Sequence, residues 1–474
     1  MSYNLIEERW IPVICKSGTK KFISPLEIVD NVDPPIEVRS PRSDFDSAVT
    51  QFLIGLVQTV SMPKNVTEWI ELMTNYANST ELCNRMLDVK KYFELFGDGI
   101  RFQQCIGKKE SFVDIYKILM SSPGDNTIKN KVDFYFKNKE GGFSIPCTAM
   151  AWITAQVYLK QGGSGHFPSL RGTKPMTTIL VGQTLWETIT LNLVLKEDFY
   201  GDLNSNCFPW IKEDKEEYVV PKDNNPLMCY WATPLNGHLG DVECGKCILT
   251  GEEGKIVKNF WRSRGTSYRS WLHPFSPTEI NLKDLKNCEM SHRWVQYGNW
   301  ISLMYETEHI KPAKCMMLAM KYERERIFRN RKNSIRLWIS GYEYNQATVA
   351  FWIDSKYPIV GSHLDYDFSK SVVEGLIRVT RGFDKKLSTY LRRFKLESNN
   401  ASNWLWLKSE SLFLNTMSSI NEGDDLNQLL KKWEKMIRSI TLSIYDEQTS
   451  ILDTDKIGDV VMGRFSLETC KIKR

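Results

Sequence analysis

The last hundred residues carry the most constraining feature of this sequence, which is a helical spacing of apolar side chains. Two stripes recur at intervals of three and four residues: Val373, Leu376, Ile377, Phe383, Leu387, Tyr390, Leu391 and Phe394, then Leu426, Leu429, Leu430, Trp433, Met436, Ile437 and Ile440. Such spacing gives an α-helix one apolar face. Two more apolar segments, 403–417 and 455–472, and short polar connections predict an antiparallel four-helix bundle over residues 371–474.

The preceding residues change character repeatedly and predict a larger mixed domain. WIPVIC and KKFISPLEI flank the turn KSGT, which is typical of a β-hairpin. Residues 45–57 place apolar side chains on one face of a helix, whereas residues 100–290 alternate short apolar runs with Gly, Pro and Asn clusters. Since 474 residues exceed what one core usually organises, we expect an α+β protein with long loops in residues 1–370 and the bundle in residues 371–474.

Charge and cysteine content restrict the partners and the compartment. The formal net charge of +5 neither requires nor excludes nucleic acid, but the basic clusters at residues 321–336 and 378–395 together favour a polyanion. No run of about eighteen uncharged apolar residues occurs, and the N-terminus lacks a secretory pattern. The eleven cysteines are mostly scattered singly, which suits a reducing compartment. We therefore expect a cytoplasmic protein with no membrane partner.

CGKC, from Cys244 to Cys247, has the spacing of half a zinc site, because two such thiolates can grip one ion. The nearest second pair is SIPC, where Ser144 stands at the position of the first thiolate and Cys147 at the second. Serine is a poor zinc ligand. Two interpretations stay open: zinc held by Cys147, Cys244 and Cys247, or a structural relic whose cysteines pack together. No cofactor is required.

Catalytic motifs are missing from the sequence. The histidines stand apart, at positions 166, 238, 273, 292, 309 and 363, and none forms HxH, HExxH or an HD pair. Neither a phosphate-binding GxxxxGK[ST] loop nor a GxSxG elbow occurs. HPFSP at His273 is better explained as a turn. We therefore expect a protein that is not an enzyme.

Two segments predict a surface that contacts another molecule closely. The run QGGSGHFPSLRG follows an apolar helix and contains Gly162, Gly163 and Gly165, which let bare backbone approach a surface. The segment WISGYEYNQATVAFW predicts a hairpin that projects Asn345 and Gln346 near its tip. An amide side chain offers both a donor and an acceptor, as the edges of bases require. An ordinary surface hairpin is the alternative.

In their order along the chain, these motifs resemble one family. NLIEERWIPV, PRSDFDSAV, CTAMAWI followed by QGGSGHFPSLRG, the single CGKC, WLHPFSP and GYEYNQA are similar to CasA, the large subunit of the type I-E CRISPR surveillance complex called Cascade. The resemblance spans nearly the whole chain. It implies a noncatalytic subunit that finds the protospacer-adjacent motif in double-stranded DNA from the minor groove, starts strand separation and helps recruit a helicase-nuclease. The implied partners are target DNA, CRISPR RNA and the other Cascade subunits.

The resemblance also implies which residues meet the DNA. The glycine loop corresponds to Gly162, Gly163 and Gly165, and the glutamine of the hairpin tip to Gln346, with Asn345 and Ala347 beside it. A basic finger precedes WLHPFSP. Family members carry a lysine there, whereas ungapped counting reaches Arg262, with Lys258 and Arg264 as neighbours. Arginine is a planar, multidentate donor, so the preferred motif is expected to differ.

Two other functions stay open at this point. A metal-dependent nuclease would use the cysteines and dispersed histidines, and would cut labelled DNA in the presence of divalent metal. A purely structural scaffold would bind without dependence on a DNA motif.

Overall fold

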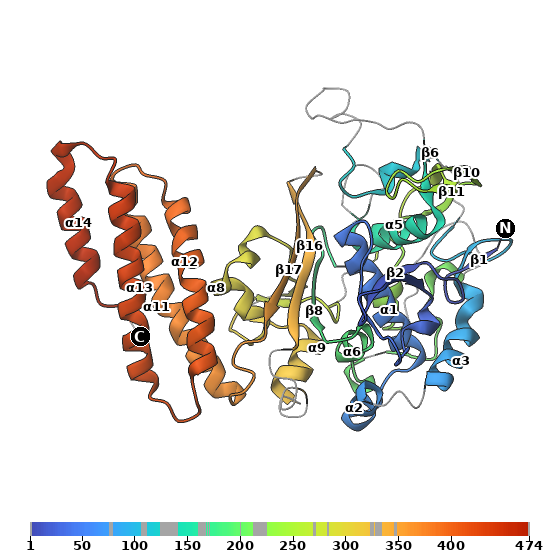
Figure 1. Cartoon of the computed structure of the whole chain (residues 1–474), viewed down its shortest axis with the longest axis horizontal. Coiled ribbons are helices and arrows are strands. Elements are labelled where there is room, and N and C mark those ends of the chain that lie inside the picture. The colour runs from blue at the N-terminus through green and yellow to red at the C-terminus, as the bar shows by residue number, and fades with distance from the viewer. Residues whose placement is uncertain are drawn as a thin grey trace. The chain divides into compact units, whose positions relative to one another are not determined.

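The structure is a computed structural model that describes residues 2–472 apart from 75–78, 106–110, 124–140, 160–166, 168, 170, 200, 212–224, 269–271, 282–283, 323–326, 328–333 and 346–347. The chain forms two compact units (Figure 1). The N-terminal unit comprises residues 1–292, 308–318 and 334–357. The helical unit comprises residues 293–307, 319–333 and 358–474. The prediction of a mixed α/β protein with a helical C-terminal region is confirmed.

The predicted hairpin near the N-terminus is present. Strands β2 (Ile11–Cys15) and β3 (Lys20–Ile23) pair antiparallel, with Ile11 opposite Ile23. The turn between them contains Gly18 at φ 87°, a backbone conformation that glycine adopts without a steric penalty. Strand β4 (Pro35–Val38) pairs with the other edge of β2. This sheet leads directly into helix α1.

Helix α1 (Ser43–Val60) is the central helix of the N-terminal unit. Its side chains are buried from Asp44 to Gln58, so the prediction of one buried face was too narrow. Polar side chains can be buried here because they find partners. The Gln58 amide donates to the Val194 carbonyl at 2.9 Å and accepts from the Val194 N–H at 2.7 Å. Burial on every side makes α1 the support for the elements around it.

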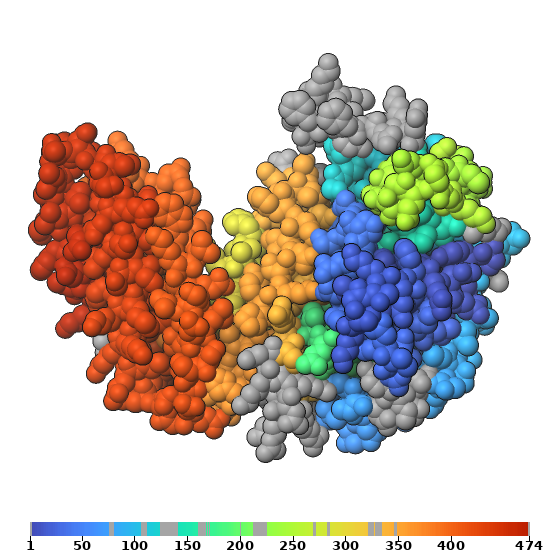
Figure 2. Space-filling model, viewed as in Figure 1, coloured from blue at the N-terminus to red at the C-terminus, as the bar shows by residue number. Residues whose placement is uncertain are grey.

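Helix α5 (Ile145–Tyr158) packs along α1. A three-stranded sheet in the order β17-β16-β8 lies beside these helices (Figure 1). Its strands are β8 (Met176–Val181), β16 (Arg336–Asn345) and β17 (Thr348–Pro358). Because β8 is buried and most of β17 is exposed or half-buried, the sheet presents its outer strand to the surface. Figure 2 shows β16 and β17, in light orange, at the surface of the N-terminal unit.

Three small antiparallel sheets complete the region whose pattern was irregular in sequence. One has the order β10-β11-β7, a second β6-β12-β9 and a third β14-β13-β15. Their strands are β6 (Ser111–Asp114), β7 (Phe143–Ser144), β9 (Gly237–Leu239), β10 (Val242–Lys246), β11 (Glu253–Val257), β12 (Asn259–Arg262), β13 (Thr278–Asn281), β14 (Asp284–Asn287) and β15 (Ile310–Lys311). Strands β1 (Tyr3–Asn4) and β5 (Glu94–Phe96) form a further pair.

The described part of the N-terminal unit contains further short helices beside an aromatic core. They are α2 (Val66–Thr74), α3 (Ser79–Val89), α6 (Leu185–Leu191), α7 (Met228–Trp231) and α9 (Lys314–Met317). In the core, the ring of Phe52 makes edge contacts with Trp10 at 5.6 Å and with Trp231 at 5.9 Å between centroids. Such edge-to-face pairs add to the stabilisation from burial.

The helical unit contains α11 (Tyr366–Arg393), α12 (Ser398–Ser419), α13 (Leu426–Thr449) and α14 (Ile457–Thr469). Helices α11, α12 and α13 pack against one another, and α14 packs on α11 and α13. The buried Trp433 indole N–H donates to the Leu376 carbonyl at 3.0 Å, which joins α13 to α11. That these helices close into an antiparallel four-helix bundle stays a prediction.

An earlier stretch of chain also belongs to the helical unit. Helix α8 (Tyr297–Trp300) packs on α12, where the Tyr297 ring stacks on Phe413 at 4.5 Å and meets Trp406 at 4.9 Å. A membrane-spanning helix was not expected, and among the described residues no helix is both long and apolar enough to cross a bilayer.

Candidate nucleic-acid interface

The described residues on the two sides of the glycine segment lie close together. Helix α5 ends at Tyr158, and the Ser169 N–H donates to the Leu159 carbonyl at 3.2 Å. The two ends of the segment are therefore joined by a backbone hydrogen bond. Gly162, Gly163 and Gly165 themselves lie outside the described residues.

The predicted hairpin also reaches this place. Strand β16 ends at the exposed Asn345 and β17 begins at Thr348, whereas Gln346 and Ala347 lie outside the described residues. One residue before Asn345, the Tyr344 hydroxyl donates to the carbonyl of Tyr158 at 2.9 Å. Burial raises the pKa of Tyr344, so its hydroxyl stays protonated and remains a donor. This hydrogen bond holds the end of β16 against the end of α5.

Aromatic packing reinforces the link between the hairpin and α5. The Tyr158 ring makes edge contacts with Tyr342 at 5.9 Å and with Trp352 at 5.3 Å between centroids. The Tyr158 hydroxyl hydrogen-bonds Ser47 of α1 at 2.7 Å. Both strands of the hairpin therefore pack against α5, the helix that precedes the glycine segment, and α5 is hydrogen-bonded to α1.

The basic segment approaches the same region from β12. Lys258 is half-buried, and its Nζ pairs with Glu243 Oε1 at 3.1 Å. Arg262 is half-buried at the end of the central strand of its sheet, and burial lowers its pKa to about 10, so it stays charged at neutral pH. The Arg264 guanidinium lies over the ring of Phe167 at 5.6 Å. Phe167 belongs to the glycine-containing run, so Arg264 contacts a described residue within that run.

The sequence and the structure favour different residues among these three as the one that contacts DNA. Ungapped counting favoured Arg262, which stays a prediction, and Arg264 entered only as its neighbour. The signal that favours Arg264 is its exposure together with a cation–π contact to Phe167. That contact spans almost a hundred residues of sequence, so no local pattern could have revealed it.

The cysteines predicted to hold metal form a pair rather than a tetrahedral set. Cys147 lies in the first turn of α5. Cys247 directly follows β10 and forms an isolated β-bridge with Gly142. A hydrogen bond from the Cys147 thiol lowers the pKa of Cys247. Cys244 is exposed on β10, opposite Lys255. Among the described residues, no three His, Cys, Asp or Glu side chains are grouped to hold a metal, and zinc binding by this set stays a prediction.

His273 has the structural role predicted for HPFSP. Its Nδ1 accepts from the Phe275 N–H at 3.1 Å, and its Nε2 lies 3.1 Å from the Cys229 carbonyl. Burial lowers the pKa of His273 well below its usual value, so the ring is neutral and Nε2 donates. The imidazole therefore fixes a buried turn.

Comparison with known proteins identifies the type of chain. The family model for CRISPR-associated protein Cse1 (CRISPR_cse1) matches residues 4–444. CasA (Cse1) from Thermus thermophilus is 16% identical with a TM-score of 0.74, and the match covers 98% of this chain and 99% of that one. Cse1 from Acidimicrobium ferrooxidans is 13% identical with a TM-score of 0.73, covering 99% and 97%. A chain of a CRISPR RNA-guided surveillance complex is 13% identical with a TM-score of 0.74, covering 99% and 100%.

Proposed function

Because the chain belongs to the family of CRISPR-associated protein Cse1, we propose that it is the noncatalytic large subunit of an RNA-guided surveillance complex that reads the protospacer-adjacent motif in double-stranded DNA. It assembles with CRISPR RNA and the other Cascade subunits, and the similarity to a chain of a CRISPR RNA-guided surveillance complex supports this assembly. It also helps recruit a helicase-nuclease, which cuts the target in its place.

One arrangement supports the DNA-reading role most directly. The hydrogen bond from Tyr344 to Tyr158 joins the end of β16 to the end of α5, which directly precedes the glycine-containing run, and Arg264 contacts Phe167 within that run. Three segments that the resemblance assigned to one DNA ligand are thus neighbours, although they come from distant parts of the sequence.

The chemistry of the minor groove explains why these residue types suit the role. That groove offers mainly acceptors and the guanine amino donor, so proteins read it by close approach and by its width. Glycines at 162, 163 and 165 allow close approach, and a guanidinium adds charge attraction to the phosphates. The carboxamide of Gln346 enters beside the first base pair beyond the motif and offsets part of its unstacking, worth about a few kcal/mol. Guide RNA pairing then reads the remaining sequence.

Gel-shift titration of the assembled complex with target duplex tests this function. We expect Gln346→Ala, and separately the Gly163→Ala and Gly165→Ala double variant, to weaken target binding by about tenfold or more, which corresponds to about 1.4 kcal/mol. All titrations use one salt concentration, because phosphate contacts make binding salt-dependent.

Gln428→Ala is the matched control, since Gln428 is an exposed glutamine on α13. It should leave target affinity unchanged, and all variants should assemble with CRISPR RNA to the same extent. Equal target affinity for Gln346→Ala, the glycine variant and the control would overturn the proposed function.

A further inference from the structure

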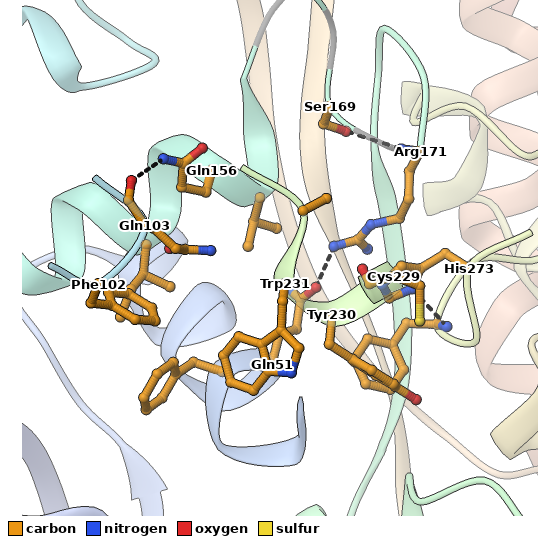
Figure 3. A pocket seen from close by; sticks show the side chains of 15 residues that line it. Gln51, Phe102, Gln103, Gln156, Ser169, Arg171, Cys229, Tyr230, Trp231 and His273 are labelled. Atoms are coloured by element: carbon orange, nitrogen blue, oxygen red, sulfur yellow. Dashed lines mark hydrogen bonds between the residues drawn. The ribbon is translucent and has the colours of Figure 1, made fainter. Parts of the chain in front are cut away.

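A buried arginine with no acidic partner lies inside the N-terminal unit. Arg171 is 5% exposed. Its guanidinium donates to Thr177 Oγ1 at 2.7 Å and to the Met176 carbonyl at 3.4 Å. It also donates to Gln51 Oε1 at 2.5 Å (Figure 3). All three acceptors are neutral. A guanidinium carries five N–H donors, so these bonds leave donor capacity unused.

The described residues around Arg171 supply no negative charge. Within the described part of the chain, no carboxylate forms an ion pair with Arg171. Burial raises the pKa of the neighbouring Cys229 thiol, which therefore stays neutral. His273 is neutral for the reason given above, and burial lowers the pKa of Arg171 only to about 10. A buried, charged and unpaired group is strongly unfavourable unless an opposite charge accompanies it.

A second unpartnered group lies in the same cavity. Gln103 is 4% exposed, and its side-chain Oε1 has no hydrogen-bond partner. The backbone of Gln103 has φ 50°, in the left-handed region that glutamine rarely adopts. Its carbonyl is occupied, because it accepts from the Trp152 indole at 3.2 Å. The strained backbone thus carries a buried amide whose oxygen has no partner among the described residues, and exchanging the amide O and N atoms places the NH₂ donor at that unpartnered position.

The two groups line one small cavity of about 40 Å³, together with Gln51, Gln156, Cys229 and His273 (Figure 3). A single water needs about 10–15 Å³ of such space, so the cavity holds about three waters or one small ion. A phosphate with its ester groups is too large, which excludes the DNA backbone as the occupant.

We propose that this cavity binds a small monovalent inorganic anion, of the size of a halide or nitrate, between the Arg171 guanidinium and the Gln103 amide. The anion neutralises the buried charge and accepts the hydrogen bonds that the protein leaves unmade. The anion also joins three parts of the chain. Gln51 belongs to α1, Thr177 belongs to β8, and Gln103 lies in the segment after β5. The inference does not depend on the proposed function.

Bromide is the probe, since it can be located by its anomalous scattering. Crystals of the full chain grown or soaked in sodium bromide should show an anomalous peak in the cavity, within hydrogen-bond distance of the Arg171 guanidinium. A cavity without a bromide peak, in crystals that show bromide elsewhere, would overturn the proposal.

Thermal unfolding gives the solution test. At constant ionic strength, replacing gluconate by bromide or nitrate should raise the Tm of the wild type saturably, by about 1–2 °C. Arg171→Gln and Gln103→Met should lose this rise, and Arg378→Gln, an exposed arginine on α11, should keep it. Gln103→Met keeps the test decisive if Arg171→Gln does not fold. An equal rise in Gln103→Met and wild type would contradict the assigned site.

Discussion

At the scale of single residues, Asp46 of α1 links stability to pH. Its side chain is 9% exposed, and burial raises its pKa from 3.8 to about 6, although Ser40 N–H donates to Oδ1 at 2.7 Å. Between these two pKa values the folded state holds the proton more tightly than the unfolded state. The free energy of unfolding contributed by Asp46 therefore falls as the pH rises from about 4 to about 6, and is constant above that window.

Asp46→Asn should remove this pH dependence while it keeps an acceptor for Ser40. We expect the variant to be more stable than wild type above pH 6 by up to about 2–3 kcal/mol, with the difference vanishing near pH 4. Urea unfolding across this range measures it. Asp455→Asn, which changes an exposed carboxylate, is the control. If Asp46→Asn retained the wild-type slope between pH 4 and 6, another group would carry the effect.

Residue patterns predicted the environments of His273, Cys147 and Cys247, but they did not predict the environment of Cys244. His273 was recognised as a turn residue because HPFSP is a local motif, and its bonds to Phe275 and Cys229 are consistent with that. The proximity of Cys147 and Cys247 followed from their motifs, but the exposure of Cys244 did not, because spacing alone does not say which way a strand residue faces. Zinc binding stays a prediction, and it lacks a ligand set among the described residues.

At the scale of elements, α14 contains two glycines with opposite surroundings. A Cβ atom at Gly463 would lie 2.2 Å from the Tyr445 hydroxyl oxygen, and Tyr445 is buried with its hydroxyl bound to the Val460 carbonyl. A Cβ atom at Gly458 would meet nothing within 4 Å. Gly463 therefore lets α14 pack on α13, whereas Gly458 has no packing reason to lack a side chain.

The matched pair of alanine variants tests this assignment. Gly463→Ala should destabilise the protein by about 1–3 kcal/mol, because the buried tyrosine must move. Gly458→Ala should stabilise it by about 0.5–1 kcal/mol, because alanine is the better helix former. Urea denaturation followed by circular dichroism measures both changes. Equal effects of the two substitutions would show that close packing at Gly463 is not what distinguishes them.

The sequence predicted elements well where one pattern decides the structure. The β2–β3 hairpin, α1 and the C-terminal helices all follow from local spacing. The burial of α1 on every side does not follow from local spacing. Gln51 and Gln58 are polar and are expected to face solvent unless their partners on distant segments are known. The contacts of Tyr344 with Tyr158 and of Arg264 with Phe167 were beyond sequence reasoning for the same reason.

At the scale of the whole molecule, the helical unit is assembled from separated pieces of chain. Residues 293–307 belong to it, although they precede β15, β16 and β17 of the N-terminal unit. Apolar periodicity marks contiguous segments and gives no sign that Tyr297 and Trp300, which are 1% and 0% exposed, pack with helices a hundred residues later. A single boundary along the sequence therefore does not assign residues 293–307 to the helical unit.

Truncation after residue 357 should reveal that interleaving. The cut removes α12 and leaves the aromatic side chains of α8 without Trp406 and Phe413. We expect fragment 1–357 to bind a hydrophobic dye and to aggregate more readily than the full chain, because a large apolar patch becomes exposed. A monomeric fragment with the dye binding of the full chain would contradict this expectation.

We propose that the glycine-containing run, the hairpin tip and Arg264 read one short DNA motif together. The most direct measurement is a selection by the assembled complex from duplexes with a constant protospacer and randomised flanking bases. The account predicts that wild type enriches a short motif on one flank, and that Gln346→Ala and Arg264→Gln weaken that enrichment while binding RNA normally. Random flanks for wild type, or undiminished enrichment in both variants, would contradict it.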